Sequence, residues 1–185
     1  ALALLEEFGS SENHIRHMRA VEAALRAYAR RWGEDEEHWG AIGLLHDFEY
    51  DRYPDDHPHA GARILRERGY PEEVVHAVLA HGETGVARTT PLAKALYAVD
   101  ELTGFLVAVT LVRPSKDIRE VNLKSVQKKW KDRAFAAAVD REAIERAALE
   151  MGVELWEHVG IVLEAMQGVA AEIGLAGQPA APAGG

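Results

Sequence analysis

Residues 14–32, HIRHMRAVEAALRAYARRW, carry the clearest helical pattern in the chain. Their apolar side chains recur every three or four residues, which is the spacing of a helix with one buried face. We expect Asn13, directly before this stretch, to cap the helix. His14 and His17 fall on the apolar face, so the pattern turns imidazole groups toward the interior. The apolar positions of this face are Ile15, Met18, Val21, Leu25, Tyr28 and Trp32.

The same spacing continues along most of the sequence, and no run of alternating β-branched residues predicts a strand. The length of 185 residues fits one domain. We expect residues 1–175 to form a single all-helical domain, a bundle of about seven to nine helices. The segment 176–185 is rich in Gly, Pro and Ala and is expected to be disordered. After an apolar N-terminal turn, the helices are expected over about 14–32, 35–46, 56–68, 71–81, 91–112, 121–138, 140–151 and 153–174, with Asp35, Asp56 and Thr90 at helix starts.

The composition limits the class of protein. The sequence contains no cysteine, which excludes disulfides, thiolate zinc sites and cysteine nucleophiles. A formal net charge of −9, from 21 basic and 30 acidic side chains, argues against a general nucleic-acid-binding protein. No stretch approaches the ~18 apolar residues of a membrane span, and the N-terminus has no signal-peptide pattern. We expect a cytoplasmic protein whose partners include no membrane and no nucleic-acid polymer, and we leave a homo-oligomer open.

Polar side chains point inward from three separate helices. In the helix expected over 91–112, Asp100 lies at the edge of the apolar face, whereas Glu101 points to the opposite side. A carboxylate turned toward a core costs several kcal/mol unless it is paired, hydrogen-bonded or bound to a metal. His46 and Asp47 are adjacent at a helix end, where both can reach one ion. With the histidines of 14–32, this mixture of imidazole and carboxylate groups suits Mn, Fe, Co, Ni or Zn, with Mg as a further option.

Three local sequences carry a resemblance to a known family. They are HMRAVE at 17–22, GLLHD at 43–47 and AVDEL at 98–102. In this order they resemble the HD superfamily of metal-dependent phosphohydrolases, over about residues 13–139. The resemblance implies an all-helical bundle with a metal site buried between helices. It also implies that His17, His46, Asp47 and Asp100 bind one ion, although the residues alone do not distinguish His17 from His14.

A second resemblance concerns the number of metal ions. The sequences HPHAG at 57–61 and HGE at 81–83 are similar to the two-metal members of the superfamily. The similarity implies that His57 and His81 bind a second ion, with Asp47 bridging the two; His59 is assigned either an indirect role or none. Gly82 replaces a second histidine that some relatives have, and Tyr50 replaces the lysine of some cyclic-dinucleotide hydrolases. We therefore do not expect cyclic-dinucleotide cleavage.

The HD resemblance implies a hydrolase of a small phosphorylated molecule, a nucleotide or a related phosphoester. A divalent metal lowers the pKa of its bound water, which gives a hydroxide that can attack phosphorus. In the loop after the ligand pair, Glu49 or Asp51 is expected to act as general acid or base, or to hydrogen-bond a metal-binding histidine. Plain solvated loop carboxylates are the alternative for both.

A basic segment lies between Arg113 and Arg133, where eight basic side chains accompany three acidic ones. Such a run is most often a solvated surface, but its functional interpretation is phosphate binding. Lys124 and Lys128, four residues apart on one helix face, are the predicted pair.

Two further functions stay open for the same ligands. The first is a di-iron oxygenase or a hydratase of small molecules, and the second is a ligand-binding HD domain without turnover. The remaining histidines have no motif around them and are expected to be ordinary core or surface residues: His14, His38, His76 and His158.

Overall fold

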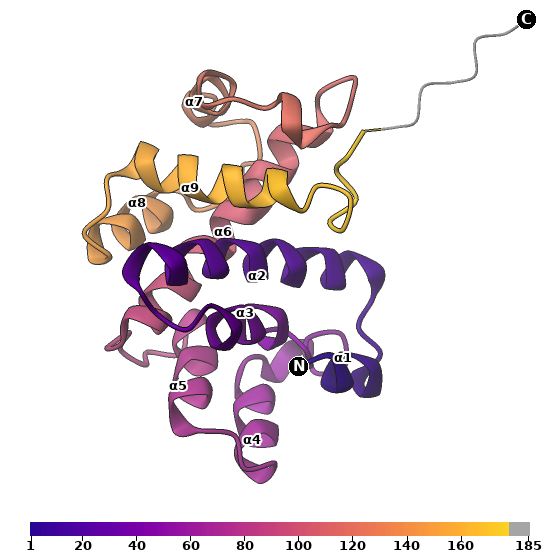
Figure 1. The fold of residues 1–185 in the computed structure, drawn as a ribbon, viewed down its shortest axis with the longest axis vertical. Helices are drawn as coiled ribbons and strands as arrows, with labels where there is room; N and C mark the ends of the chain where they lie inside the picture. Colours follow the sequence, from indigo (N-terminus) through magenta and orange to yellow (C-terminus); the bar gives the residue numbers. More distant parts are fainter. Residues whose placement is uncertain (178–185) are drawn as a thin grey trace, which may run out of the picture.

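The computed structural model describes residues 1–177, and these residues form helices joined by short connections (Figure 1). The all-helical prediction is therefore confirmed for this part of the chain. Two 3₁₀ helices, Pro54–Asp56 and Ile118–Glu120, lie in the connections. The α-helices are α1 Leu2–Phe8, α2 Glu12–Trp32, α3 Glu36–Leu45, α4 His59–Glu67, α5 Glu72–His81, α6 Pro91–Leu111, α7 Leu123–Lys131, α8 Arg141–Glu150 and α9 Leu155–Gly168.

Helix α2 runs through the centre of the bundle, with α9 on one side and α3 on the other (Figure 1). It also packs on α6, and α6 in turn packs on α5. The buried face of α2 includes Met18, Val21, Leu25 and Tyr28. Burial of each such side chain contributes roughly 1.5–3 kcal/mol, so this face anchors the three neighbouring helices.

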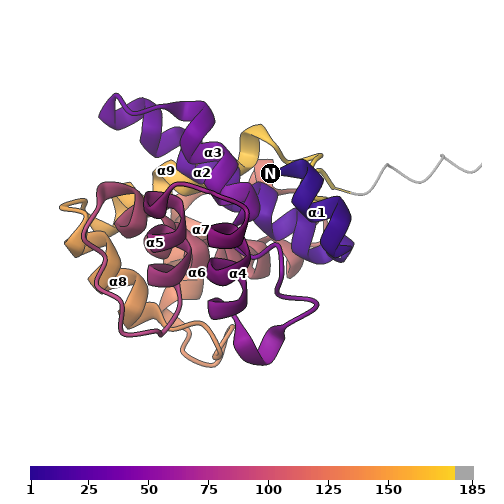
Figure 2. The same ribbon diagram turned by 90° about the horizontal axis from the view of Figure 1, so that it is seen from below.

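The two ends of the bundle carry different elements. Helices α4 and α5 pair at one end of the long axis, and α7 lies at the opposite end (Figure 1). Seen from below, α4 and α5 cover the end of the bundle, with α1 and α8 on opposite sides of them (Figure 2). The segment from α3 to α5 therefore lies far from the basic segment along this axis.

Several helix starts follow the predicted caps. Asp35 accepts the N–H of His38 at the start of α3, and Thr90 accepts the N–H of Ala93 at the start of α6. Such bonds satisfy N–H groups that have no partner within the helix. These two caps are confirmed.

Two other predicted starts are wrong. Ser11, not Asn13, caps α2, because its side chain accepts the N–H of His14 and the helix already includes Glu12. Asp56 does not start α4, since Pro54–Asp56 form a separate 3₁₀ turn and the helix begins at His59.

The helix predicted over 121–138 is also shorter, because α7 ends at Lys131. The carboxylate of Asp132 accepts the N–H groups of Ala134 and Phe135, which folds the chain into a turn. The buried guanidinium of Arg141 donates hydrogen bonds to carbonyl groups that would accept backbone N–H groups if the helix continued. These carbonyls belong to Asp132, Phe135, Ala136 and Val139.

Differences also occur at both chain ends. The apolar N-terminal turn is a full helix, α1, and α9 ends at Gly168 rather than near 174. Ala176 forms an isolated antiparallel bridge with Asp117, so the ordered chain continues past residue 175. The rest of the tail predicted to be disordered, residues 178–185, lies outside the described residues. No helix of residues 1–177 combines the length and the apolar character needed to cross a membrane.

Candidate metal centre

Side chains from five parts of the chain converge between the helices. Several sets of three offer ligand atoms that all lie within 4.8 Å of one another. The residues are the six predicted ligands, so the structure brings all of them together. They are His17 on α2, His46 and Asp47 after α3, His57 before α4, His81 at the end of α5 and Asp100 on α6.

One half of the cluster, called here the inner lobe, consists of His17, His46, Asp100 and the Oδ2 atom of Asp47. His17 Nε2 lies 3.0 Å from Asp100 Oδ1 and 3.6 Å from Asp47 Oδ2. His46 Nε2 lies 3.5 Å from Asp47 Oδ2 and 3.6 Å from Asp100 Oδ1. Two imidazole nitrogens and two carboxylate oxygens are thus within reach of one ion, a donor set that suits a divalent transition metal.

The other half, called the outer lobe, consists of His57, His81 and the Oδ1 atom of Asp47. His57 Nε2 lies 3.3 Å from Asp47 Oδ1, and His81 Nε2 lies 3.2 Å from the same atom. The two Nε2 atoms are 3.2 Å apart. Asp47 therefore directs one oxygen to each lobe, which is the arrangement of a bridging carboxylate.

The second ring nitrogen of each histidine fixes its orientation. His46 Nδ1 lies 2.8 Å from the carbonyl oxygen of Gly43, and His81 Nδ1 faces the carbonyl oxygen of Val78. A carbonyl only accepts hydrogen bonds, so we assign the hydrogen to Nδ1 in both rings. The Nε2 atom of each neutral ring then presents its lone pair to the cluster, as metal-binding histidines do.

This assignment tests whether a metal fits. Nδ1 of His57 lies 2.9 Å from Oε1 of Glu49; with the hydrogen of this ring on Nδ1 as well, lone pairs at Nε2 of His57 and His81 would face each other and a carboxylate oxygen without any hydrogen between them. His46 Nε2 is buried and has no hydrogen-bond partner. A cation between these atoms removes the repulsion and satisfies the buried nitrogen, so the residues fit a metal in both lobes.

The inner lobe carries strong electrostatic coupling. Burial opposes a charge on His46, but the carboxylates of Asp47 and Asp100 outweigh it and raise the pKa of His46 to about 9. Burial likewise disfavours charge on the two carboxyls, yet the facing imidazoles hold the pKa of Asp47 and of Asp100 below the usual range. A metal entering this lobe therefore displaces a proton and takes over the charge balance.

A close helix crossing places His46 beside His17. A Cβ added at Gly43 would lie 2.8 Å from the Cα and 2.9 Å from the backbone nitrogen of Glu22 on α2. Backbone atoms cannot move aside cheaply, so a larger residue at position 43 would separate α3 from α2. Gly43 of the GLLHD sequence thus allows α3 to pack close to α2, which keeps His46 near His17.

Glu49 and Asp51 occupy two different environments. Glu49 is fully buried, and its Oε1 atom lies 2.9 Å from Nδ1 of His57. Asp51 is exposed and turns to the start of α2, where it accepts the N–H of Ser11 and lies 2.6 Å from Nδ1 of His14. The structure therefore places Glu49 behind a ligand, and Asp51 against a histidine that is not a predicted ligand.

The structure does not bring the predicted phosphate-binding lysines to the cluster. Lys124 and Lys128 are exposed on α7, at the opposite end of the bundle from α4 (Figure 1). Val126 and Trp130 are the buried residues of α7, and they turn the lysine face to solvent. His59, the first residue of α4, is also exposed.

Two cavities open beside the cluster, with volumes of about 380 and 400 Å³. Both are lined by Asp100 and Glu101, and neither is lined by a lysine or an arginine among the described residues. Glu101 was predicted to point away, but it lies at the rim of both cavities, where it accepts the N–H of Asp140. Other lining residues absent from the predicted site include His14, Tyr50, Glu83, Tyr97 and Asp140.

Sequence reasoning missed His14 and Tyr97 for a clear reason. His14 shares a helix face with His17, three residues on. Spacing therefore gave no reason to prefer one imidazole, and only His17 matched the family pattern. Tyr97 lies three residues before Asp100 on α6 and gave no signal, because a tyrosine on an apolar face fits a core equally well.

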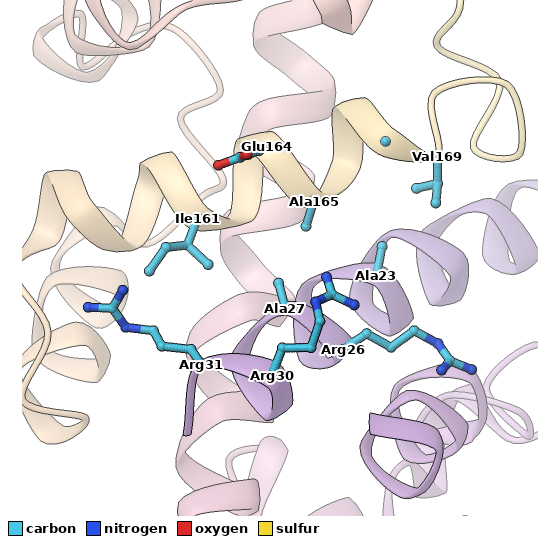
Figure 3. Close-up of a pocket in the computed structure, with 10 residues that line it drawn as sticks. Ala23, Arg26, Ala27, Arg30, Arg31, Ile161, Glu164, Ala165 and Val169 are labelled. Atoms are coloured by element: carbon cyan, nitrogen blue, oxygen red, sulfur yellow. The ribbon is translucent and has the colours of Figure 1, made fainter. Parts of the chain in front are cut away.

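A larger groove, of about 700 Å³, lies away from the cluster between α2 and α9 (Figure 3). Small residues of the two helices, such as Ala27 and Ala165, face each other across it. Three arginines line it, but each is already paired with glutamate: Arg26 with Glu22 and Glu37, Arg30 with Glu36, and Arg31 with Glu157. Its described lining has a single carboxylate, Glu164, and no histidine, so the groove is not the candidate metal site (Figure 3).

The fold and the cluster define a helical protein with a buried histidine–aspartate centre suited to divalent metals. Comparison with known families agrees, because residues 15–104 match the HD domain family. Residues 15–104 therefore resemble an HD domain, and HD domains are generally found in metal-dependent hydrolases. The recognition made from HMRAVE, GLLHD and AVDEL is confirmed.

One curated relative with a clear match is ribonuclease Y from Oleidesulfovibrio alaskensis. It is 33% identical over 97 residues, which cover 51% of this chain and 18% of that protein. The chain thus spans about a fifth of the length of this relative. No solved structure matches the chain.

Proposed function

We propose that this protein is a metal-dependent phosphohydrolase with two ions, acting on a small phosphoester. The observation that supports it is the division of the cluster into two lobes that share Asp47, whose two oxygens face opposite sets of imidazole nitrogens. When bound, a pair of divalent ions activates water and neutralises the charge that develops on phosphoryl oxygens.

The residues of the chain have separate tasks in this proposal. The inner lobe would hold an ion with two imidazoles and two carboxylate oxygens, and the outer lobe would hold one with two imidazoles and the shared carboxylate. Glu49 orients His57 from behind and does not face the cavities. It is therefore not our candidate for proton transfer to the substrate.

His14 is the better candidate for moving a proton. It lines the same cavity as His17 and Asp47, and its Nδ1 atom lies 2.6 Å from Asp51 Oδ1. A carboxylate behind a histidine fixes its tautomer and stabilises its charged form. Nε2 of His14 would then donate a proton to the oxygen of the leaving group, which gives Asp51 a role as positioning residue.

The cavity walls favour a substrate of low negative charge. Apart from the ligands, they carry the carboxylates Glu83, Glu101 and Asp140 and no lysine or arginine among the described residues. A chain of phosphates would face these carboxylates without a compensating cation. A single phosphoester, whose charge is met by the ions, fits better than a polyphosphate.

The similarity to ribonuclease Y supports a second candidate, the hydrolysis of a phosphodiester in RNA. The acidic cavity walls and the net charge of −9 weigh against it. Oxygenase and hydratase chemistry would use the same ligands.

Three further properties stay proposals: a small phosphorylated partner, a homo-oligomer and a cytoplasmic location.

The test uses the full chain, stripped with chelator and reloaded separately with Mn, Fe, Co, Ni, Zn or Mg. We expect hydrolysis of one or more phosphomonoesters from a panel of nucleotides and sugar phosphates, with triphosphates and short RNA cleaved more slowly. Glu164→Ala, an exposed carboxylate of α9, serves as a control that should retain activity. Oxygen consumption with the iron form, and no phosphate release with any metal, would contradict the proposal.

A further inference from the structure

Glu49 is a buried carboxylate that is not one of the six predicted metal ligands, so its burial needs another explanation. Its side chain has no exposure to solvent. One oxygen, Oε1, faces Nδ1 of His57 at 2.9 Å, while the other, Oε2, has no hydrogen-bond partner. A buried carboxylate with a single neutral partner is costly, so positive charge close to it would stabilise it.

Gly61 explains how the carboxylate fits. A Cβ added at this position would lie 2.6 Å from Oε2, 2.7 Å from Cδ and 2.8 Å from Oε1 of Glu49. The glycine is inside α4 and has an ordinary helical backbone, so turn geometry does not require it. The missing side chain instead makes the space that the carboxylate occupies.

His57 therefore differs from the other oriented histidines. His46 and His81 each donate to a backbone carbonyl, which is neutral and fixed by its helix. Nδ1 of His57 instead faces the carboxyl group of a side chain, and a hydrogen bond from Nδ1 to a carboxylate would strengthen Nε2 as a metal ligand. The outer lobe shares the carboxylate of Asp47 with the inner lobe, and the carboxyl group of Glu49 stands directly behind its ligand His57.

We propose that Glu49 and Gly61 act as one unit that sets the affinity of the outer lobe for its ion. Glu49 is a positioning residue that fixes the tautomer and orientation of His57, and Gly61 holds Glu49 in place by leaving room for it. The inference rests on the two-ion centre proposed above but not on the reaction that the centre performs.

The first measurement titrates metal-free full chain with Mn²⁺ and follows two binding steps by calorimetry and electron paramagnetic resonance. In Gly61→Ala the new methyl group displaces the carboxylate, because the end of a side chain moves more easily than the backbone. We expect the outer ion to bind roughly 10–100-fold more weakly, the usual cost of losing a partner behind a ligand, and the inner ion to bind as before. Gly168→Ala, a helical glycine with nothing within 4 Å, is the matched control and should bind both ions normally.

The second measurement asks whether the two residues act together. Glu49→Ala should weaken the outer ion by a similar factor, and Glu49→Ala/Gly61→Ala should be no weaker than Glu49→Ala alone, since the clash has been removed. Nitrogen-15 NMR of the metal-free protein should report hydrogen at Nδ1 of His57 in the wild type and a mixture of tautomers in Glu49→Ala.

Three results would overturn the inference. They are wild-type affinity of the outer ion in Gly61→Ala, equal loss of both ions in that variant, or strictly additive losses in the double variant. Wild-type protein that binds two ions but hydrolyses no phosphoester would remove the proposed function and leave this inference intact.

Discussion

The two lobes of the cluster share one carboxylate yet are built differently. The inner lobe places two carboxylate oxygens against two imidazoles, all carried by or next to the long packed helices α2, α3 and α6. The outer lobe offers two imidazoles and one shared oxygen, and His57 comes from the turn before α4.

This difference predicts unequal affinity. The inner lobe provides the carboxylate of Asp100 and one oxygen of the shared Asp47, whereas the outer lobe provides the other oxygen of Asp47, with the carboxyl group of Glu49 behind His57. Electrostatic attraction in a buried site is strong, so the inner ion should bind more tightly and exchange more slowly. Variants of residues that belong to one lobe should thus remove the ion of that lobe, and the loss of the tighter inner ion should be the larger change in affinity.

The largest effect is expected for Asp47→Ala, because Asp47 offers an oxygen to both lobes. Both ions should be lost, and the measurement is metal content by mass spectrometry after dialysis. A variant that still retains two ions would show that Asp47 does not join the lobes.

Asp100→Ala should remove the inner ion, since its Oδ1 atom faces both inner histidines. We expect affinity to fall by more than the roughly 10–100-fold caused by changes behind a ligand. Glu101→Ala is the control for metal content, because that carboxylate is exposed and bonds to the N–H of Asp140. Equal metal loss in both variants would contradict the orientation of α6.

His81→Ala should lower the stoichiometry from two ions to one and leave the inner ion bound. The reason is that His81 Nε2 approaches Asp47 Oδ1, on the outer side of the carboxylate. Competition with a chelator of graded strength separates the two steps. Loss of both ions at the same chelator concentration would argue against independent lobes.

The pH dependence of stability in metal-free protein tests the electrostatic interactions of the inner lobe. The pKa of His46 is raised from 6.5 to about 9, so the folded state binds more protons than the unfolded state between these values. Its contribution is fully present below pH 6.5 and is lost as pH rises through about 9, at up to roughly 1.4 kcal/mol per unit. Urea unfolding of chelated protein at pH 6.5 and pH 9 should show this decrease.

His158 supplies the contrast at low pH. It is buried, with Nε2 3.0 Å from the Ala98 carbonyl oxygen and Nδ1 2.6 Å from the hydroxyl of Tyr28. Burial lowers its pKa from 6.5 to about 4, so this histidine destabilises the fold as pH falls from 6.5 toward 4. Saturating metal should remove the loss above pH 6.5 and leave the His158 effect unchanged. Metal-free protein with a flat profile up to pH 9 would contradict the coupling at His46.

The smallest effect is expected for Lys124→Gln/Lys128→Gln. Both lysines are exposed on α7 and line neither cavity beside the cluster. Metal content and kcat/KM should stay within twofold of wild type, about 0.4 kcal/mol. A tenfold loss of kcat/KM would instead show that the basic segment binds substrate.

The sequence predicted the convergence of the ligands because helix periodicity reports which face of a helix is buried. Asp100 followed from that periodicity and the His46–Asp47 pair from its place at a helix end, whereas the HD resemblance selected His17 over His14 and added His57 and His81. Periodicity does not report where a helix lies in the bundle, so the sequence could not show that Lys124 and Lys128 lie on α7, away from the cluster (Figure 1). It also missed His14, since two histidines on one face gave equal signals.

Tertiary contacts explain most of the remaining differences. The predicted helix 121–138 is interrupted because Arg141 binds carbonyls that a helix would use. The space under Gly61 and the turn that buries Glu49 depend on how α4 meets the α3–α4 connection, a relation that local sequence does not encode.

The most direct test is anomalous diffraction from crystals of full-length protein soaked in Mn²⁺. The account predicts two peaks between α2, α3, α5 and α6, each contacted by a different oxygen of Asp47. A single peak under saturating Mn²⁺, or both oxygens of Asp47 on one ion, would contradict it.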